Sequence, residues 1–269
     1  STSISFTWEI VESNDAYIIN KVSDTLITIK HTENNKTYEM SITIPNGTTY
    51  ELNQETGMLT LTYANSSTAA ITFSLSGDYF GGIVFDINED TDIEIELNGV
   101  EITSQIDCPL YVKNAGSVDL SAKKNTENTI TDERDEVEEI ASCIYTTCDL
   151  KLKGAGTLNV YSKNNNGIHS KDDLKVQKLT LNVNCVDNAL KGNDEVIIAS
   201  GVLTLIARKG DGIKSSNTSL SSKGNQKGSI TIEDGIINIY AATDGIDAAY
   251  DLIINGGTIN IYTDKYSEY

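Results

Sequence analysis

The sequence predicts an all-β protein, folded as a right-handed, single-stranded parallel β-helix (β-solenoid) with an N-terminal β cap or small β module. The main observation is a short phrase that recurs at a steady spacing. From Ile168 to Leu190 is 22 residues, from Leu190 to Ile213 is 23, and from Ile213 to Ile246 is 33. A period in the twenties with no helical pattern is typical of stacked coils. The four copies are Asn166-Gly167-Ile168-His169, Asn188-Ala189-Leu190-Lys191, Asp211-Gly212-Ile213-Lys214 and Asp244-Gly245-Ile246-Asp247.

The second observation is that apolar residues occur at equivalent places after each phrase. With Ile144, Ile168, Leu190, Ile213 and Ile246 as anchors, a second inward residue follows six positions later at Leu150, Leu174, Val196 and Leu252. The fourth coil breaks this spacing, which indicates an insertion from Ser215 to about Gly224 that bulges out. In the last strand of each coil, period-two alternation places polar residues outside. The expected outward column is Asn159, Asn182, Thr204, Asn238 and Asn260, and the next is Tyr161, Asn184, Ile206, Tyr240 and Tyr262.

The chain divides into an N-terminal β cap or module at residues 1–55 and a β-helix at residues 56–269. The end of a solenoid exposes an unpaired strand edge, and a cap covers it. Within residues 1–55, alternations begin at Ser3, Leu26 and Tyr38, and Asn34-Asn35 and Pro45-Asn46-Gly47 are expected to be hairpin turns. Residues 123–140 are expected to form a protruding, solvated loop, and residues 264–269 a frayed tail.

Composition excludes several classes of function. The formal net charge of −19 argues against nucleic acid and anionic membranes as partners. No apolar run is long enough to span a membrane. The four cysteines lack metal-site spacing and are expected to be buried thiols, with a Cys143–Cys148 disulfide as the alternative. We expect a monomer that is secreted or displayed at the cell surface, with its export signal outside this sequence.

The residue before the Gly or Ala of each phrase forms the column Asn166, Asn188, Asp211 and Asp244. Stacked Asp211 and Asp244 would repel unless a cation lies between them, and Asp247 lies in the same turn. Three carboxylates with backbone carbonyls and water suit Ca²⁺. The alternative is that Asp and Asn occur there because they tolerate tight turns. Further candidate oxygen ligands are Asp187 with Asn188, and Asp172 stacked on Asp194.

The outward columns suggest a surface for sugars. Asn238 and Asn260 offer amides to hydroxyl groups, and Tyr240 and Tyr262 offer rings for stacking. The alternative is that stacked Asn side chains only stabilise the coils through amide hydrogen bonds along the axis.

Several phrases resemble a bacterial carbohydrate-binding β-helix family, whose clostridial members are calcium-containing, cellulose- and pectin-binding surface proteins. The resemblance covers about residues 56–263. It rests on the Asp-Gly-Ile-Lys repeats and, in order, on Gly81-Gly82-Ile83-Val84, Leu97-Asn98-Gly99-Val100-Glu101-Ile102-Thr103, Pro109-Leu110-Tyr111-Val112-Lys113-Asn114-Ala115 and Asn125-Thr126-Glu127-Asn128-Thr129-Ile130-Thr131-Asp132.

That family is similar in fold to pectate lyases of polysaccharide lyase family nine. The resemblance implies calcium held by an Asp one coil earlier and by an Asp-Asp-Gly-aromatic-Asp turn, with a Lys as base. Asp211, Asp244 and Asp247 match the acidic positions. Thr243 stands where the turn has an Asp, and Ile246 stands where it has an aromatic residue.

The remaining question is whether the protein cleaves polysaccharide. Lys214 and Lys191 are candidate bases, but neighbouring carboxylates raise a lysine pKa, and a base needs it lowered. The chain has two arginines, Arg134 and Arg208, and neither lies in a motif column. We therefore expect non-catalytic, calcium-dependent binding of plant cell-wall polysaccharide, namely pectin or polygalacturonate and also cellulose. The alternatives are a calcium-dependent pectate lyase-like enzyme and a surface adhesion or spacer protein with structural calcium.

Overall fold

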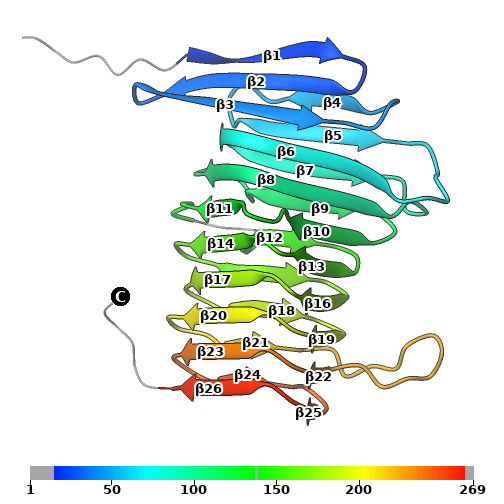
Figure 1. Cartoon of the computed structure of the whole chain (residues 1–269), viewed down its shortest axis with the longest axis vertical. Coiled ribbons are helices and arrows are strands. Elements are labelled where there is room, and N and C mark those ends of the chain that lie inside the picture. Colours follow the sequence, from blue (N-terminus) through cyan, green and yellow to red (C-terminus); the bar gives the residue numbers. More distant parts are fainter. Residues whose placement is uncertain (1–14, 137–138, 264–269) are drawn as a thin grey trace, which may run out of the picture.

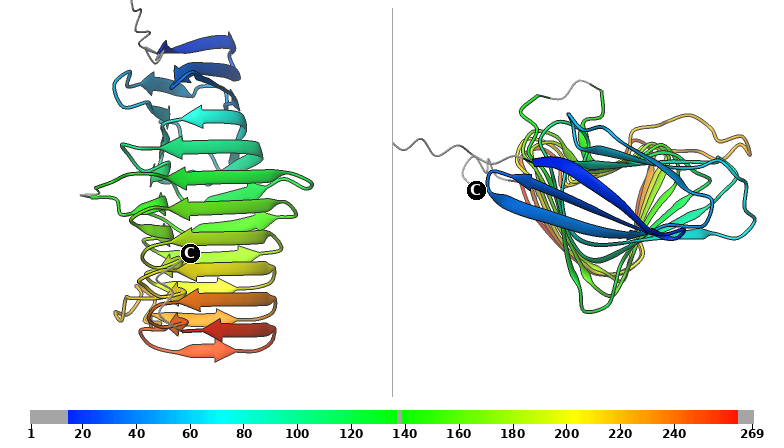
Figure 2. Two further views of the ribbon diagram at one scale, coloured as in Figure 1. Left: turned by 90° about the vertical axis from the view of Figure 1, so that its left-hand side faces the viewer. Right: turned by 90° about the horizontal axis from the view of Figure 1, so that it is seen from above.

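The computed structural model describes residues 15–136 and 139–263, and this part of the chain contains strands and no helix. It therefore also contains no helix long and apolar enough to cross a membrane. Coils stack along one axis (Figure 1), and their cross-section is triangular (Figure 2). The predicted parallel β-helix is confirmed. The expected alternation from Ser3 and the tail at 264–269 lie outside the described residues.

Three faces run along the axis. Face 1 is a nine-stranded sheet in which eight strands are parallel: β5 (Met58–Tyr63), β7 (Gly82–Ile87), β9 (Leu110–Asn114), β12 (Ser142–Thr146), β15 (Asn166–Ser170), β18 (Leu190–Gly192), β21 (Ile213–Lys214) and β24 (Ile246–Asp247).

Faces 2 and 3 form one 17-stranded sheet because the long strands β6 (Ile71–Phe80) and β8 (Ile93–Ser104) run through both. Face 2 continues with β10 (Val118–Ala122), β13 (Leu150–Gly154), β16 (Asp173–Gln177), β19 (Glu195–Ile198), β22 (Ser229–Ile232) and β25 (Leu252–Ile254). Face 3 continues with β11 (Glu127–Asp132), β14 (Thr157–Ser162), β17 (Thr180–Cys185), β20 (Val202–Ala207), β23 (Ile236–Ala241) and β26 (Thr258–Tyr262).

The first end of the stack is covered by antiparallel strands. β1 (Asp15–Ser23), β2 (Leu26–Glu33) and β3 (Lys36–Thr43) form a meander, and β3 pairs antiparallel with β6. β4 (Thr49–Leu52) pairs antiparallel with β5 on face 1. Asn34 and Asn35 make the β2–β3 hairpin with positive φ angles of 49° and 64°, as Asn tolerates. The other expected hairpin was wrong, because Pro45-Asn46-Gly47 links β3 to a strand in a different sheet.

The predicted register of the later coils is confirmed. The anchor residues pair from Ile144 through Ile246 along face 1. On face 3 the outward Asn159, Asn182, Thr204, Asn238 and Asn260 pair in that order. The inserted loop of the fourth coil runs between β21 and β22, and its second inward residue is Ile230, which pairs with Val196 and Leu252.

The core is one continuous cluster of buried side chains, from Tyr17 in the cap to Ala241 in β23. Most inward residues are aliphatic, because each is buried away from water against equivalent residues of the neighbouring coils. The four cysteines are buried free thiols, as expected. Burial comes first among the causes that raise the pKa of Cys108 and of Cys185 to about 12.

The expected solvated loop at residues 123–140 is wrong for a third of its length. Residues 127–132 form β11, which pairs in parallel with β8 and β14. The chain leaves the coil only after Asp132, and a buried ion pair fixes that exit. Arg134 Nε lies 2.7 Å from Asp132 Oδ1, and its Nη2 donates to Asp132 Oδ2 at 2.8 Å and to Ser142 O at 2.8 Å. Pattern reasoning treats charged runs as solvated, but this carboxylate is 0% exposed.

Replacing Arg134 with Ala should lower the free energy of unfolding by about 3–5 kcal/mol, because it leaves a buried carboxylate without its cation. Urea denaturation measures the change. Lys163→Ala is the matched control, because Lys163 Nζ reaches the same loop at the exposed Asp135 (2.5 Å), and its denaturation midpoint should stay at the wild-type value. An Arg134→Ala midpoint equal to that of wild type would contradict the assignment.

Candidate functional site

The turns that enter face 1 are joined by a ladder of polar side chains. Each side-chain oxygen accepts a hydrogen bond from the backbone N–H of the equivalent residue in the next coil. Asn188 N donates to Asn166 Oδ1 (3.1 Å), Asp211 N to Asn188 Oδ1 (3.2 Å) and Asp244 N to Asp211 Oδ1 (3.0 Å). Asn166, Asn188 and Asp211 are each 5% exposed. This ladder satisfies buried N–H groups that the strands do not pair.

Two further candidate calcium ligands, Asn188 and Asp187, lie at the same turns. The Asn188 amide is engaged on both sides, since its Nδ2 also donates to Asn166 Oδ1 at 2.8 Å. Asp187 is exposed. One of its carboxylate oxygens lies close above Gly210, where an added Cβ would approach it to 2.7 Å.

Asp211, Asp244 and Asp247 converge at the end of this ladder. One carboxylate oxygen of each lies within 4.8 Å of the others, and no other acidic, His or Cys trio in residues 15–136 and 139–263 does so. The Lys214 ammonium lies among them, with Nζ 2.7 Å from Asp211 Oδ2 and 2.5 Å from Asp247 Oδ2. The Thr243 hydroxyl donates to Asp211 Oδ1. The like-charge contact that the sequence predicts is therefore partly balanced by a lysine.

This arrangement shifts both partners toward their charged forms. Burial favours the neutral acid at Asp211, but hydrogen bonds from Lys214, Thr243 and the Asp244 backbone outweigh it and lower the pKa. Burial likewise acts to lower the pKa of Lys214, yet hydrogen bonds to Asp211 and Asp247 raise it well above its ordinary value. Lys214 is thus held as a cation at neutral pH. Lys191, the other candidate base, occupies the equivalent position one coil earlier.

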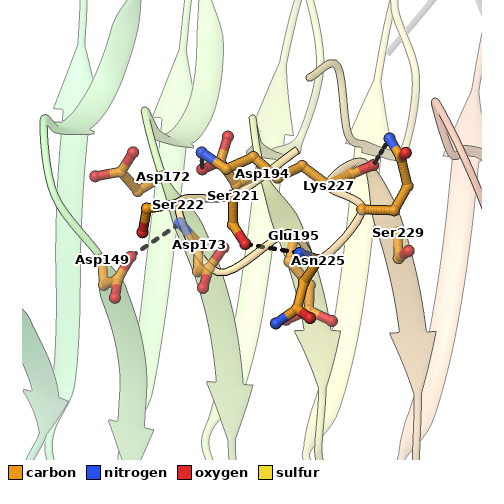
Figure 3. A pocket seen from close by; sticks show the side chains of 11 residues that line it. Asp149, Asp172, Asp173, Asp194, Glu195, Ser221, Ser222, Asn225, Lys227 and Ser229 are labelled. Carbon is orange, nitrogen blue, oxygen red and sulfur yellow. Dashed lines mark hydrogen bonds and ion pairs between the residues drawn. The ribbon is translucent and has the colours of Figure 1, made fainter. Parts of the chain in front are cut away.

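A second acidic region lies at the face 1–face 2 edge, in a pocket of about 520 Å³ beneath the inserted loop (Figure 3). It contains the predicted pair Asp172 and Asp194. Asp194 accepts from Asn217 Nδ2 at 2.6 Å and pairs with Lys227, both from the inserted loop. The structure thus brings this pair together but gives Asp194 protein partners.

Sequence reasoning missed three further carboxylates of this pocket, Asp149, Asp173 and Glu195. Burial, followed by the nearby Asp149 and Glu195, raises the pKa of Asp173 to about 6. A signal for them was present, because each directly precedes the second inward residue of its coil, so that acidic residues recur at one position of the repeat.

The outward asparagines of face 3 form amide hydrogen bonds along the axis. The alternative interpretation of this column, in which the asparagines only stabilise the coils, predicts such bonds. Asn260 Nδ2 donates to Asn238 Oδ1 at 2.9 Å, and Asn182 Nδ2 to Asn159 Oδ1 at 2.9 Å. The rings of Tyr240 and Tyr262 are stacked, with centroids 4.9 Å apart and planes 12° apart. Each ring therefore covers one face of the other, and 47% of Tyr262 is exposed.

Comparison with known proteins agrees with this architecture. A family model described as "Carbohydrate-binding domain-containing protein" matches residues 60–269. A curated protein of that description from Acetivibrio thermocellus is 33% identical over 111 residues, which is 39% of this chain and 39% of the relative. The chain therefore spans well under half the length of that relative.

A solved structure has the same fold along most of the chain. It is described as a gadolinium derivative of the polysaccharide lyase-like protein from C. thermocellum, with 26% sequence identity and a TM-score of 0.65, and the match covers 85% of this chain and 92% of that one. Since the family model matches more than half of the residues, this chain belongs to the family of carbohydrate-binding domain-containing proteins.

Proposed function

We propose that this protein binds plant cell-wall polysaccharide without cleaving it, and that calcium at Asp211, Asp244 and Asp247 bridges the protein to uronate chains such as polygalacturonate. Family membership supports a polysaccharide as the ligand. The charge of −19 supports a divalent cation as the bridge, because two anionic polymers otherwise repel.

The position of Lys214 is the observation that supports binding without cleavage. A lyase base has to be a neutral amine near neutral pH, whereas Lys214 is bonded to two carboxylates that hold it protonated. Neither arginine is available at this site. Arg134 is buried against Asp132, and Arg208 donates to Ser162 O at 2.9 Å and packs over the Tyr161 ring.

The three carboxylates fit the chemistry of calcium. They supply hard oxygen ligands within 4.8 Å of one another, and Asp244 is exposed, so that water and substrate oxygens can complete a shell of six to eight ligands. Lys214 holds oxygens of Asp211 and Asp247 that the ion would need, and its side chain is 28% exposed. We propose that calcium displaces this ammonium into solvent, where a lysine has its ordinary pKa of about 10.4 and stays protonated at neutral pH. The similar solved structure is a gadolinium derivative, and gadolinium is also a hard cation that prefers oxygen.

The alternatives remain a calcium-dependent lyase and an adhesion or spacer protein with structural calcium. Asp187, Asn188, Asp172 and Asp194 are proposed as weaker calcium ligands, since the last three already have partners or neighbours within the protein. Asn238, Asn260, Tyr240 and Tyr262 are retained as proposed sugar contacts. We also propose a monomer located outside the cell or at its surface.

Calcium should raise the melting temperature of the wild-type protein, because a ligand that binds only the folded state stabilises it. The increment should vanish in Asp247→Asn and grow in Lys214→Gln, which removes the competing ammonium. Asp251→Asn is the control, since Asp251 is exposed on the same coil outside the trio. Thermal scans with calcium and with chelator measure this, and equal increments in Asp247→Asn and wild type would sink the calcium assignment.

Affinity electrophoresis through polygalacturonate should retard the wild-type protein with calcium and release it with chelator. Asp247→Asn should migrate as the chelated protein does. Incubation with polygalacturonate should give no rise in ultraviolet absorbance from unsaturated products. A rise that Lys214→Gln abolishes would establish the lyase alternative, and migration unaffected by every glycan tested would favour the adhesion or spacer alternative.

A further inference from the structure

We propose that the outward column Tyr111, Tyr145 and His169 on face 1, together with the pocket beside it, binds the backbone of a neutral polysaccharide. This inference deepens the proposed carbohydrate-binding function and rests on it. It places a binding strip on a different face from Tyr240 and Tyr262, and upstream of the carboxylate trio.

Register makes the column continuous. Val84, Tyr111, Tyr145, His169, Lys191, Lys214 and Asp247 occupy equivalent outward positions of successive coils. Equivalent residues of neighbouring coils lie about 4.8 Å apart. A linear polymer laid parallel to the axis would therefore meet a ring at each of three consecutive coils.

The rings are arranged differently from the stacked pair on face 3. Tyr111 and Tyr145 have centroids 5.7 Å apart and planes 52° apart, and Tyr145 meets His169 edge-on at 5.0 Å with planes 80° apart. All three side chains are half-buried. Tilted rings do not cover one another's faces as parallel rings do. Such half-buried, mutually braced rings offer apolar area at low entropic cost, as rings at binding surfaces do.

His169 adds a hydrogen-bonding group to the strip. Its Nε2 lies 2.9 Å from Asn193 Oδ1, an acceptor, so the proton belongs on Nε2 and Nδ1 is an acceptor for a hydroxyl group. Burial first, and Lys191 as well, lower the pKa of His169 to about 4, although the bond to Asn193 opposes the shift. The ring is therefore neutral at neutral pH, as a partner for uncharged hydroxyls should be.

At the Tyr111 end the strip opens into a pocket of about 550 Å³. Val84, Tyr111 and the 55% exposed Ile106 give it apolar walls, and Asp107 adds a carboxylate. Its volume lies within the range of small-ligand pockets. Apolar walls with a few acceptors match a sugar ring, which presents C–H groups on its faces and hydroxyl donors at its rim.

Charge selects the class of polysaccharide. Asp107, Glu136 and Glu139 line the described part of the pocket, and no lysine does; the single arginine, Arg134, is committed to Asp132. A uronate would meet repulsion there. The strip thus fits a neutral glucan or xylan, whereas the trio at Asp211, Asp244 and Asp247 is where calcium would admit an acidic chain.

The test measures affinity of the full chain for a soluble neutral glucan, a xylan and polygalacturonate, with calcium and with chelator. Tyr145→Ala and Tyr111→Ala should each weaken binding of the neutral glycan about tenfold, with or without calcium. Tyr145→Phe should retain binding, which separates loss of the ring from misfolding. Tyr250→Ala is the matched control and should bind as wild type does, because Tyr250 is 62% exposed and lies outside both the strip and the proposed sugar contacts of face 3.

Three results would overturn the inference. One is wild-type affinity for neutral glycan in both Tyr111→Ala and Tyr145→Ala. Another is loss of that affinity in Tyr262→Ala instead, which would place the neutral glycan on face 3. The third is a wild-type protein that binds polygalacturonate with calcium but no neutral glycan, which leaves the proposed function standing. A wild-type protein that binds none of the glycans would refute the proposed function itself.

Discussion

Backbone pairing between parallel coils is the constraint on which the other features of this molecule depend. It sets neighbouring coils about 4.8 Å apart and brings equivalent residues into contact. Inward positions thereby become an aliphatic core, and outward positions become columns of like residues. Like residues in a column either assist one another, as Asn238 and Asn260 do through their amides, or repel, as carboxylates do. Repeating coils therefore create both the stability of the stack and its electrostatic strain.

The protein relieves this strain in different ways along its length. At the turns into face 1, Asn166 and Asn188 occupy the ladder where a longer run of aspartates would be costly, and Lys214 balances Asp211 and Asp247 farther on. At the pocket beneath the inserted loop, Lys227 neutralises Asp194, while Asp173 keeps a raised pKa. Each lysine supplies the positive charge that balances its neighbouring carboxylates.

Much of the fold could be predicted from the sequence, because a repeat with a steady period fixes register residue by residue. The anchors from Ile144 to Ile246 and the outward asparagines of face 3 pair as the repeat indicates. Prediction failed where the burial or direction of a side chain depends on segments that the local pattern does not place. Asp132 reads as one more acid in a charged run, and only the return of the chain to Ser142 shows its buried pairing with Arg134. The repeat likewise placed Lys214 in one column with Asp247, but it did not show that the Lys214 side chain points between Asp211 and Asp247.

The shared register also determines which changes of length the molecule can absorb. A whole coil adds one more layer and leaves every other column intact, because coils contact only their neighbours. The inserted loop before Ser229 shows that extra residues between strands are accommodated as well, since Ile230 still pairs with Val196. A single residue lost within a strand such as β17 would instead turn the residues beyond it to the opposite side, core residues outward and asparagines inward. Evolution of this architecture is thus expected to proceed by whole coils and by loops at the corners.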